Sequence, residues 1–138
     1  MPIHTLWLIP ERVVYSRIVG EEPDAVTVVY TAMQEIGKTS PHIVHAIIDD
    51  SYMTGRYNLQ TITQTKIIPN PNAGCVVVVG SNQFARMVST AIGRAVRLKF
   101  SYANTLEQGE AFLLQQDRIL TADQFTAGRA LLNALPTE

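Results

Sequence analysis

Hydrophobic and polar positions divide the chain into short apolar runs and longer stretches with helical spacing. Residues 3–20 hold two such runs, His4–Ile9 and Val13–Val19, with Pro10 and Glu11 between them. β-branched residues, which favour strands, dominate the second run. Proline cannot donate a ladder hydrogen bond, so the chain should turn there. The pattern predicts a β-hairpin.

The next segment, 23–36, contains conflicting signals. Its valines favour a strand by propensity. However, Pro23 suits a first helical position, Gly37 suits a helix end, and the apolar positions between them recur at helical spacing. The boundary signals favour a helix.

Two later runs, Ile43–Ile48 and Gly74–Val79, are apolar on both faces except for His45. Such strands are typical of sheets covered on both sides, or of central positions in a sheet. A polar–apolar stretch at 58–68 lies between them, and Leu98–Tyr102 indicates another short strand.

The clearest helix is Gln83–Arg97, which has one continuous apolar face and Ser81 or Asn82 as its N-cap. Two more helices follow it. Asn104 with Glu107 forms a capping-box pattern for the first, and Thr121 with Gln124 forms one for the second, at 121–135. The residues expected to supply their core contacts are Leu106, Ala111, Leu113 and Leu114, then Phe125, Leu131, Leu132 and Leu135.

The predicted order is therefore β-β-α-β-α-β-α-β-α with an optional tail helix. This alternation indicates an α/β fold, in which helices cover a mixed sheet of about five strands. The 138 residues amount to one domain. We expect that domain over 1–118 and a helical extension over 119–138.

The amino-acid composition argues against several kinds of partner and site. Eleven basic and twelve acidic residues give a net charge of −1, which argues against a nucleic-acid partner. A single cysteine, Cys75, excludes an internal disulfide and a cysteine-rich zinc site. No apolar run reaches the length of a membrane span, and the first residues lack a secretion signal. We expect a cytoplasmic protein without membrane insertion.

This order of elements resembles the STAS domain, the fold of sulfate transporters and anti-sigma-factor antagonists. Three features over about residues 3–116 carry the resemblance. They are the opening hairpin, the strand that runs into Asp50-Ser51, and the unit from Gly74 to Gly80 followed by Asn82, a long helix and the closing stretch Thr105–Leu113. The closest likeness is to divergent stand-alone bacterial members.

The resemblance implies a phosphorylation switch at Ser51, next to Asp50, which would control binding to a kinase-like or sigma-regulatory protein. A phosphate there would meet a helix N-terminus. The chain departs from the family pattern because Tyr52-Met53-Thr54 precede Gly55. The alternative is that Ser51 only caps a helix.

The other polar motifs have a structural and a functional interpretation. Asp49 and Asp50 are adjacent on a strand and should face opposite sides, so we predict no metal site. His4, His42 and His45 lack zinc-ligand spacing, and Cys75 should be a buried thiol. The sequence Gly80-Ser81-Asn82 is either a tight turn or an anion site.

The polar face of the predicted helix at 83–97 carries Arg86, Arg94 and Arg97 and no acid. It is either a solvated face or a docking stripe for an acidic surface. One candidate for that surface is the acidic C-terminal third of a second copy. The apolar face of the predicted helix at 121–135 needs burial against its own domain or a second chain, and for it we favour a homodimer contact.

These observations predict a non-enzymatic protein–protein interaction module in bacterial signalling, without a cofactor. The alternative is a small-ligand or nucleotide-binding domain with its site at the carboxyl ends of the strands, around Asp50, Ser51, Gly80, Ser81 and Asn82. An enzyme ranks third, because no set of acid, base and nucleophile can be assembled.

Overall fold

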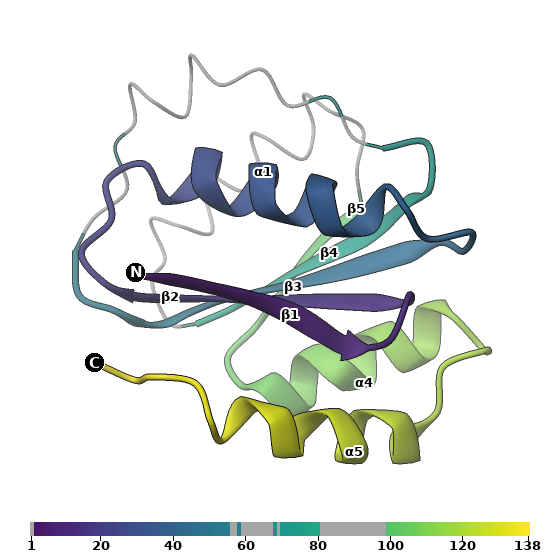
Figure 1. Cartoon of the computed structure of the whole chain (residues 1–138). Coiled ribbons are helices and arrows are strands. Elements are labelled where there is room, and N and C mark those ends of the chain that lie inside the picture. Colours follow the sequence, from purple (N-terminus) through teal and green to yellow (C-terminus); the bar gives the residue numbers. More distant parts are fainter. Residues whose placement is uncertain (1, 56–57, 59–67, 69, 81–98) are drawn as a thin grey trace.

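A mixed β-sheet is the centre of the fold (Figure 1). The computed structural model describes residues 2–55, 58, 68, 70–80 and 99–138. The described strands lie in the order β1-β2-β3-β4-β5, with bounds Ile3–Ile9, Val13–Gly20, Val44–Met53, Ala73–Val79 and Lys99–Ala103. β1 is antiparallel to β2, and every other neighbouring pair is parallel. The predicted α/β class with a mixed sheet of about five strands is confirmed.

The predicted hairpin is present at residues 3–20. Its turn includes Glu11, whose φ of 62° is in the left-handed region, and is closed by a 3.0 Å hydrogen bond from the Arg12 amide to the Ile9 carbonyl. Pro10 sits in this turn, where its missing N–H costs no ladder bond.

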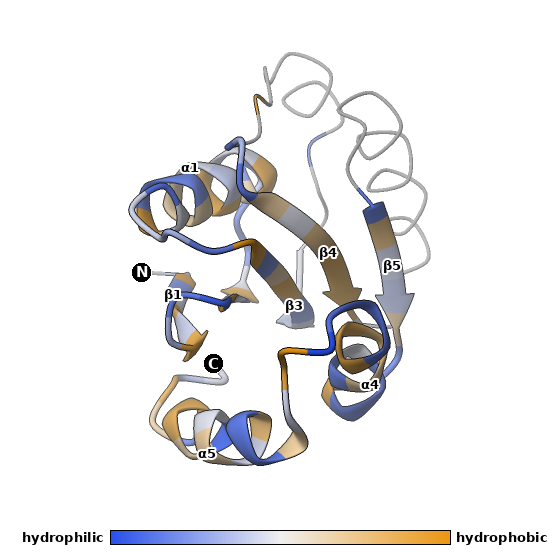
Figure 2. Ribbon diagram, turned by 90° about the vertical axis from the view of Figure 1, so that its right-hand side faces the viewer, coloured by the Kyte–Doolittle hydropathy of each residue, from blue (hydrophilic) through white to orange (hydrophobic). Residues whose placement is uncertain are grey.

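Helices cover both faces of the sheet (Figure 2). α1 (Ala25–Gly37) lies on one face, and α4 (Leu106–Gln116) and α5 (Ala122–Leu132) lie on the other (Figure 1). Val29 of α1 packs in a buried cluster with alternate residues of the strands, and Leu113 and Phe125 pack in a second cluster. β2 is buried from Val13 to Val19, as expected of a central strand with covered faces.

The two C-terminal helices confirm one predicted cap and correct the other. α5 has the capping box of Thr121 and Gln124. α4 begins one residue later than expected, because Thr105 takes the extended cap conformation and its hydroxyl accepts from the Gln108 amide at 3.2 Å. Asn104 is therefore not the N-cap.

Most predicted core contacts of these helices are correct. Leu113, Phe125 and Leu132 are buried, whereas Ala111 and Leu131 are exposed, against expectation. α5 meets the sheet through Phe125, Gly128 and Leu132, so Leu131 faces outward. A Cβ on Gly128 would lie 2.2 Å from the Leu8 carbonyl oxygen, which shows how closely α5 approaches β1.

The stretch at 58–68, except Asn58 and Ile68, and the predicted helix Gln83–Arg97 lie outside the described residues. In the part of the chain that is described, no helix combines the length and the apolar character needed to cross a bilayer.

Candidate functional site

A β-bulge at Asp50 and Ser51, near the carboxyl end of β3, changes the direction of the polar side chains there. Arg17 pairs with Asp49 and Val19 pairs with Tyr52, so two residues of β3, Asp50 and Ser51, stand opposite one residue of β2. A bulge bends its strand and redirects side chains, and bulges are frequent beside functional sites. Here the bulge folds the Ser51 amide back onto Asp49 Oδ1, at 3.1 Å.

Ser51 lies inside β3 and not at the start of a helix. The expected helix cap is therefore wrong, because β3 continues through the bulge to Met53. The Ser51 hydroxyl donates to Asp49 Oδ1, the same oxygen that accepts from its amide. The helix-terminus argument for a phosphate at Ser51 no longer applies.

Asp49 begins a chain of buried hydrogen bonds between β3 and β2. The Tyr15 hydroxyl donates to Asp49 Oδ2 at 2.5 Å and accepts from Arg17 Nε at 3.0 Å. Burial, and then the Asp49 carboxylate, raise the pKa of Tyr15, so its phenol stays protonated and remains a donor. Tyr15 therefore fixes the position of Arg17.

The rest of the Arg17 guanidinium has neutral surroundings. It lies over the ring of Tyr52, 4.4 Å from the ring centroid, and Nη1 donates to the carbonyls of Leu135 and Pro136 at 3.4 and 3.3 Å. Arg17 as a whole is only 5% exposed. Among the described residues it forms no ion pair.

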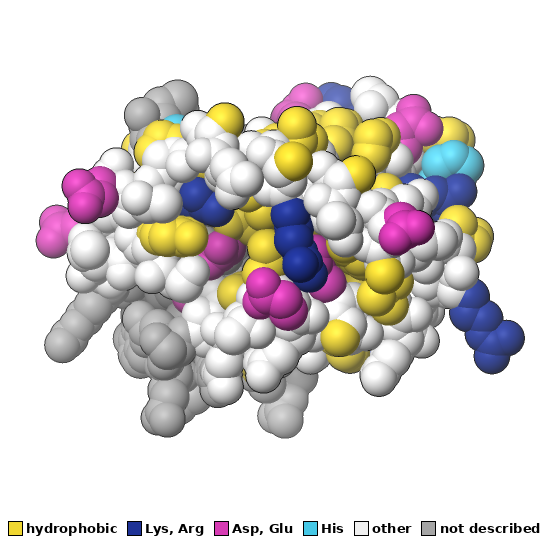
Figure 3. All heavy atoms as spheres, turned by 90° about the horizontal axis from the view of Figure 1, so that it is seen from below, with side chains coloured by type: hydrophobic (Ala, Val, Ile, Leu, Met, Phe, Trp, Pro, Cys, Tyr) yellow, Lys and Arg dark blue, Asp and Glu magenta, His cyan; other side chains and the backbone are white. Residues whose placement is uncertain are grey.

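Arg17 lines a hollow of about 330 Å³, which we call the carboxyl-edge hollow. Its walls come from the sheet, the start of α4, the end of α5 and the C-terminal segment. The lining residues are Arg17, Tyr52, Leu106, Arg129, Leu132, Asn133, Leu135 and Thr137. Figure 3 views the α4 and α5 side of the molecule, where basic, acidic and apolar side chains adjoin one another at the centre.

Arg129 of α5 is the second cation among the described lining residues, and it forms an ion pair with Glu110 of α4. Arg129 Nε lies 2.7 and 3.1 Å from the two Glu110 oxygens, and Nη2 also donates to Oε1. The Glu110 side chain is 3% exposed and that of Arg129 is 41% exposed. Glu110 therefore anchors Arg129 while the arginine side chain stays partly exposed to solvent.

The structure brings together some of the predicted site residues. Asp50 lies beside Gly80, where a Cβ would sit 1.8 Å from Asp50 Oδ1. Neither residue lines the carboxyl-edge hollow. Ser81 and Asn82 lie outside the described residues, as do three predicted docking residues, Arg86, Arg94 and Arg97. In the described ranges, no three His, Cys, Asp or Glu side chains converge as metal ligands.

A second polar cluster lies at the amino ends of the parallel strands. His45 Nδ1 accepts from the Cys75 amide at 3.0 Å, so the proton is on Nε2, which donates to Asp117 Oδ2 at 2.9 Å. This bond from His45 lowers the pKa of Asp117. Burial raises the pKa of Cys75, which is buried as predicted. The cluster ties the end of α4 to the sheet.

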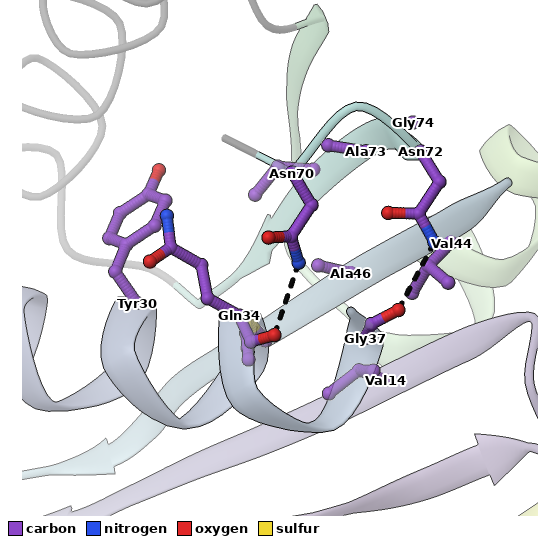
Figure 4. A pocket seen from close by; sticks show the side chains of 12 residues that line it. Val14, Tyr30, Gln34, Gly37, Val44, Ala46, Asn70, Asn72, Ala73 and Gly74 are labelled. Carbon is purple, nitrogen blue, oxygen red and sulfur yellow. Dashed lines mark hydrogen bonds between the residues drawn. The ribbon is translucent and has the colours of Figure 1, made fainter. Parts of the chain in front are cut away.

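A smaller gap of about 60 Å³ lies between α1 and strands β2 to β4 (Figure 4). The side-chain amides of Asn70 and Asn72 donate to the Gln34 and Gly37 carbonyls, each at 3.1 Å (Figure 4). These bonds satisfy carbonyls that the end of α1 leaves free. The gap is too small for a typical organic ligand.

The residues that build the carboxyl-edge hollow were not predicted as site residues. One signal was present in the sequence, because Arg17 is a charged residue inside Val13–Val19, a run otherwise typical of a strand. Buried charges are rare unless they are paired or functional. No comparable signal joined Arg17 to Arg129, which is 112 positions further along the chain.

Comparison with family models, curated proteins and solved structures finds no match to this chain. The resemblance to the STAS domain therefore stays a prediction.

Proposed function

We propose that this chain is a binding domain that takes a small molecule in the carboxyl-edge hollow. The observation that carries the proposal is a hollow of about 330 Å³ with Arg17 of β2 and Tyr52 of β3 in its wall. Open α/β sheets bind ligands beyond the carboxyl ends of their strands. Ligand pockets typically measure about 300–1,000 Å³, so a small metabolite fits best.

The lining supports binding because it combines an apolar surface with a few fixed polar groups. Leu106, Leu132 and Leu135 supply the apolar surface. Arg17 is fixed from two sides, by the Tyr15 hydroxyl and by the ring of Tyr52. Groups held in place before binding lose little entropy when a ligand arrives.

The same lining supports binding without a chemical step. Among the described lining residues, the polar side chains carry guanidinium, phenol, amide and hydroxyl groups and no carboxylate, imidazole or thiol. Those three groups are the usual acids, bases and nucleophiles near neutral pH.

A signalling interaction module has less support. Its phosphorylation argument placed Ser51 at a helix start, and Ser51 lies in β3. Its docking stripe lies outside the described residues. The ligand-binding interpretation rests on described side chains.

The test is a screen of a fragment library by amide chemical-shift mapping on ¹⁵N-labelled protein. We expect saturable shifts at Leu106, Leu132 and Asn133. Asn133→Trp should block the hollow and abolish binding. The matched control is Ala127→Trp, at an exposed position of α5 that does not line the hollow, and this variant should bind normally.

Three results would contradict the proposal: no saturable binder, shifts confined to other parts of the molecule, or equal binding by the two tryptophan variants.

A further inference from the structure

We infer that the ligand of the carboxyl-edge hollow carries an anionic group, a carboxylate or a phosphate, which Arg17 binds with the help of Arg129. This inference rests on the proposed function and adds the chemical class of the ligand. The evidence for it is the set of hydrogen-bond and ion-pair partners that Arg17 and Arg129 have in the hollow.

In the described part of the chain, no carboxylate forms a direct ion pair with the buried charge of Arg17. Its cross-strand partner is Asp49, but Asp49 uses Oδ2 for the Tyr15 hydroxyl and Oδ1 for Ser51. The described partners of the Arg17 guanidinium are the Tyr15 hydroxyl, two backbone carbonyls and the rings of Tyr15 and Tyr52. Burying a charge without an ion pair costs free energy. Such energetically unfavourable arrangements are found mainly at functional sites.

The remaining polar groups of the lining are mainly hydrogen-bond donors. Arg129 lies in the same wall and, among the described residues, has Glu110 as its ion-pair partner. Glu110 takes Nε and Nη2, so Nη1 of Arg129 makes none of these bonds. The Asn133 amide and the Thr137 hydroxyl can also donate. The described residues that line the hollow include no acidic side chain.

Two backbone carbonyls of the C-terminal segment occupy the position next to Arg17 Nη1 that an anion would take. The Leu135 and Pro136 carbonyls accept from Arg17 Nη1 at 3.4 and 3.3 Å, near the long limit for such bonds. A charged oxygen adds the attraction between opposite charges to the hydrogen bond with a guanidinium, and such bonds are shorter, at about 2.7–2.9 Å. An anionic ligand would therefore compete well with these carbonyls.

The test compares three probes that share one ring: benzoate, phenyl phosphate and neutral benzamide. Binding is measured by calorimetry, and amide shifts locate it in the hollow. We expect at least one anion to bind about tenfold more tightly than benzamide, as a charge-assisted hydrogen bond of about 1.5 kcal/mol implies. The better of the two anions identifies the ligand as a carboxylate or a phosphate.

Arg17→Gln should remove the preference for the anion. The matched control is Arg118→Gln, which removes the same charge from an exposed arginine beyond the far end of α4 and should keep the preference. If Arg17→Gln does not fold by circular dichroism, two further measurements replace it. Arg129→Gln should weaken anion binding, and added salt should weaken the anions but not benzamide.

Benzamide binding as tightly as both anions would overturn the inference and leave the proposed function standing. A second result would also overturn the inference and leave the proposed function standing. In that result the fragment screen finds binders, but neither anion binds at about 10 mM, a concentration well above the Kd of even a weak ligand. Failure of every fragment as well would remove the proposed function itself.

Discussion

Replacing Arg129 with methionine should destabilise the protein more than its exposed position suggests. The guanidinium of Arg129 faces Glu110, whose side chain is 3% exposed and holds it through both oxygens. Methionine keeps much of the length and apolar stem of arginine. It leaves the Glu110 carboxylate buried without its partner.

The exposure of each partner sets the expected magnitude. Breaking a fully buried ion pair costs about 3–5 kcal/mol, and exposed pairs are worth at most about 1 kcal/mol. The Arg129 side chain is 41% exposed, so water screens its half of the pair. We expect Arg129→Met to lower the free energy of unfolding by about 2–3 kcal/mol, between those limits.

Urea unfolding followed by circular dichroism and Trp7 fluorescence measures this loss. The control is the double variant Glu110→Gln with Arg129→Met, in which no charge is left unpaired and most of the stability should return. A loss under about 0.5 kcal/mol, or a double variant no more stable than the single one, would refute the reasoning.

Three further predictions concern stability. Gly128→Ala, which would stabilise an ordinary helix by up to about 1 kcal/mol, should instead lower the melting temperature, because its Cβ would meet the Leu8 carbonyl at 2.2 Å. Phe125→Ala should cost about 3–5 kcal/mol in urea unfolding, since this ring is 1% exposed in the core. The His45 bond lowers the pKa of Asp117 from 3.8, so it stabilises the fold above that value and its contribution is lost as the pH falls through the lowered pKa. Asp117→Asn should therefore flatten the dependence of unfolding free energy on pH below about pH 4.

The predicted elements that the structure confirms are those with strong local signals. Pro10 and the β-branched run after it mark the hairpin, and Thr121 with Gln124 marks the start of α5. The helix predicted over 23–36 is present as α1 despite the strand propensity of its valines, and Gly37 is its last residue. It begins at Ala25 with Asp24 as N-cap, so Pro23 lies before the cap and not at the first helical position. Caps and turns act within a few residues, so the sequence is enough to find them.

The candidate site depends on contacts that no local pattern records. The bulge at Asp50-Ser51 comes from the pairing of two strands, so the sequence placed a helix cap where β3 continues. The hollow joins Arg17 to Arg129 across the whole chain. Arg17 within the run Val13–Val19 indicated only that a buried charge would need polar partners, and it did not indicate which residues these are.

The segment expected to be an extension, 119–138, supplies much of both the core and the hollow. Leu120, Phe125 and Leu132 belong to the same buried cluster as Tyr15 and Ile47. Arg129, Asn133 and Thr137 of this segment line the hollow. The apolar face that suggested a homodimer is thus buried in the same chain, against β1. Because α5 and β2 both line the hollow, we expect a change that loosens α5 to weaken the proposed ligand binding.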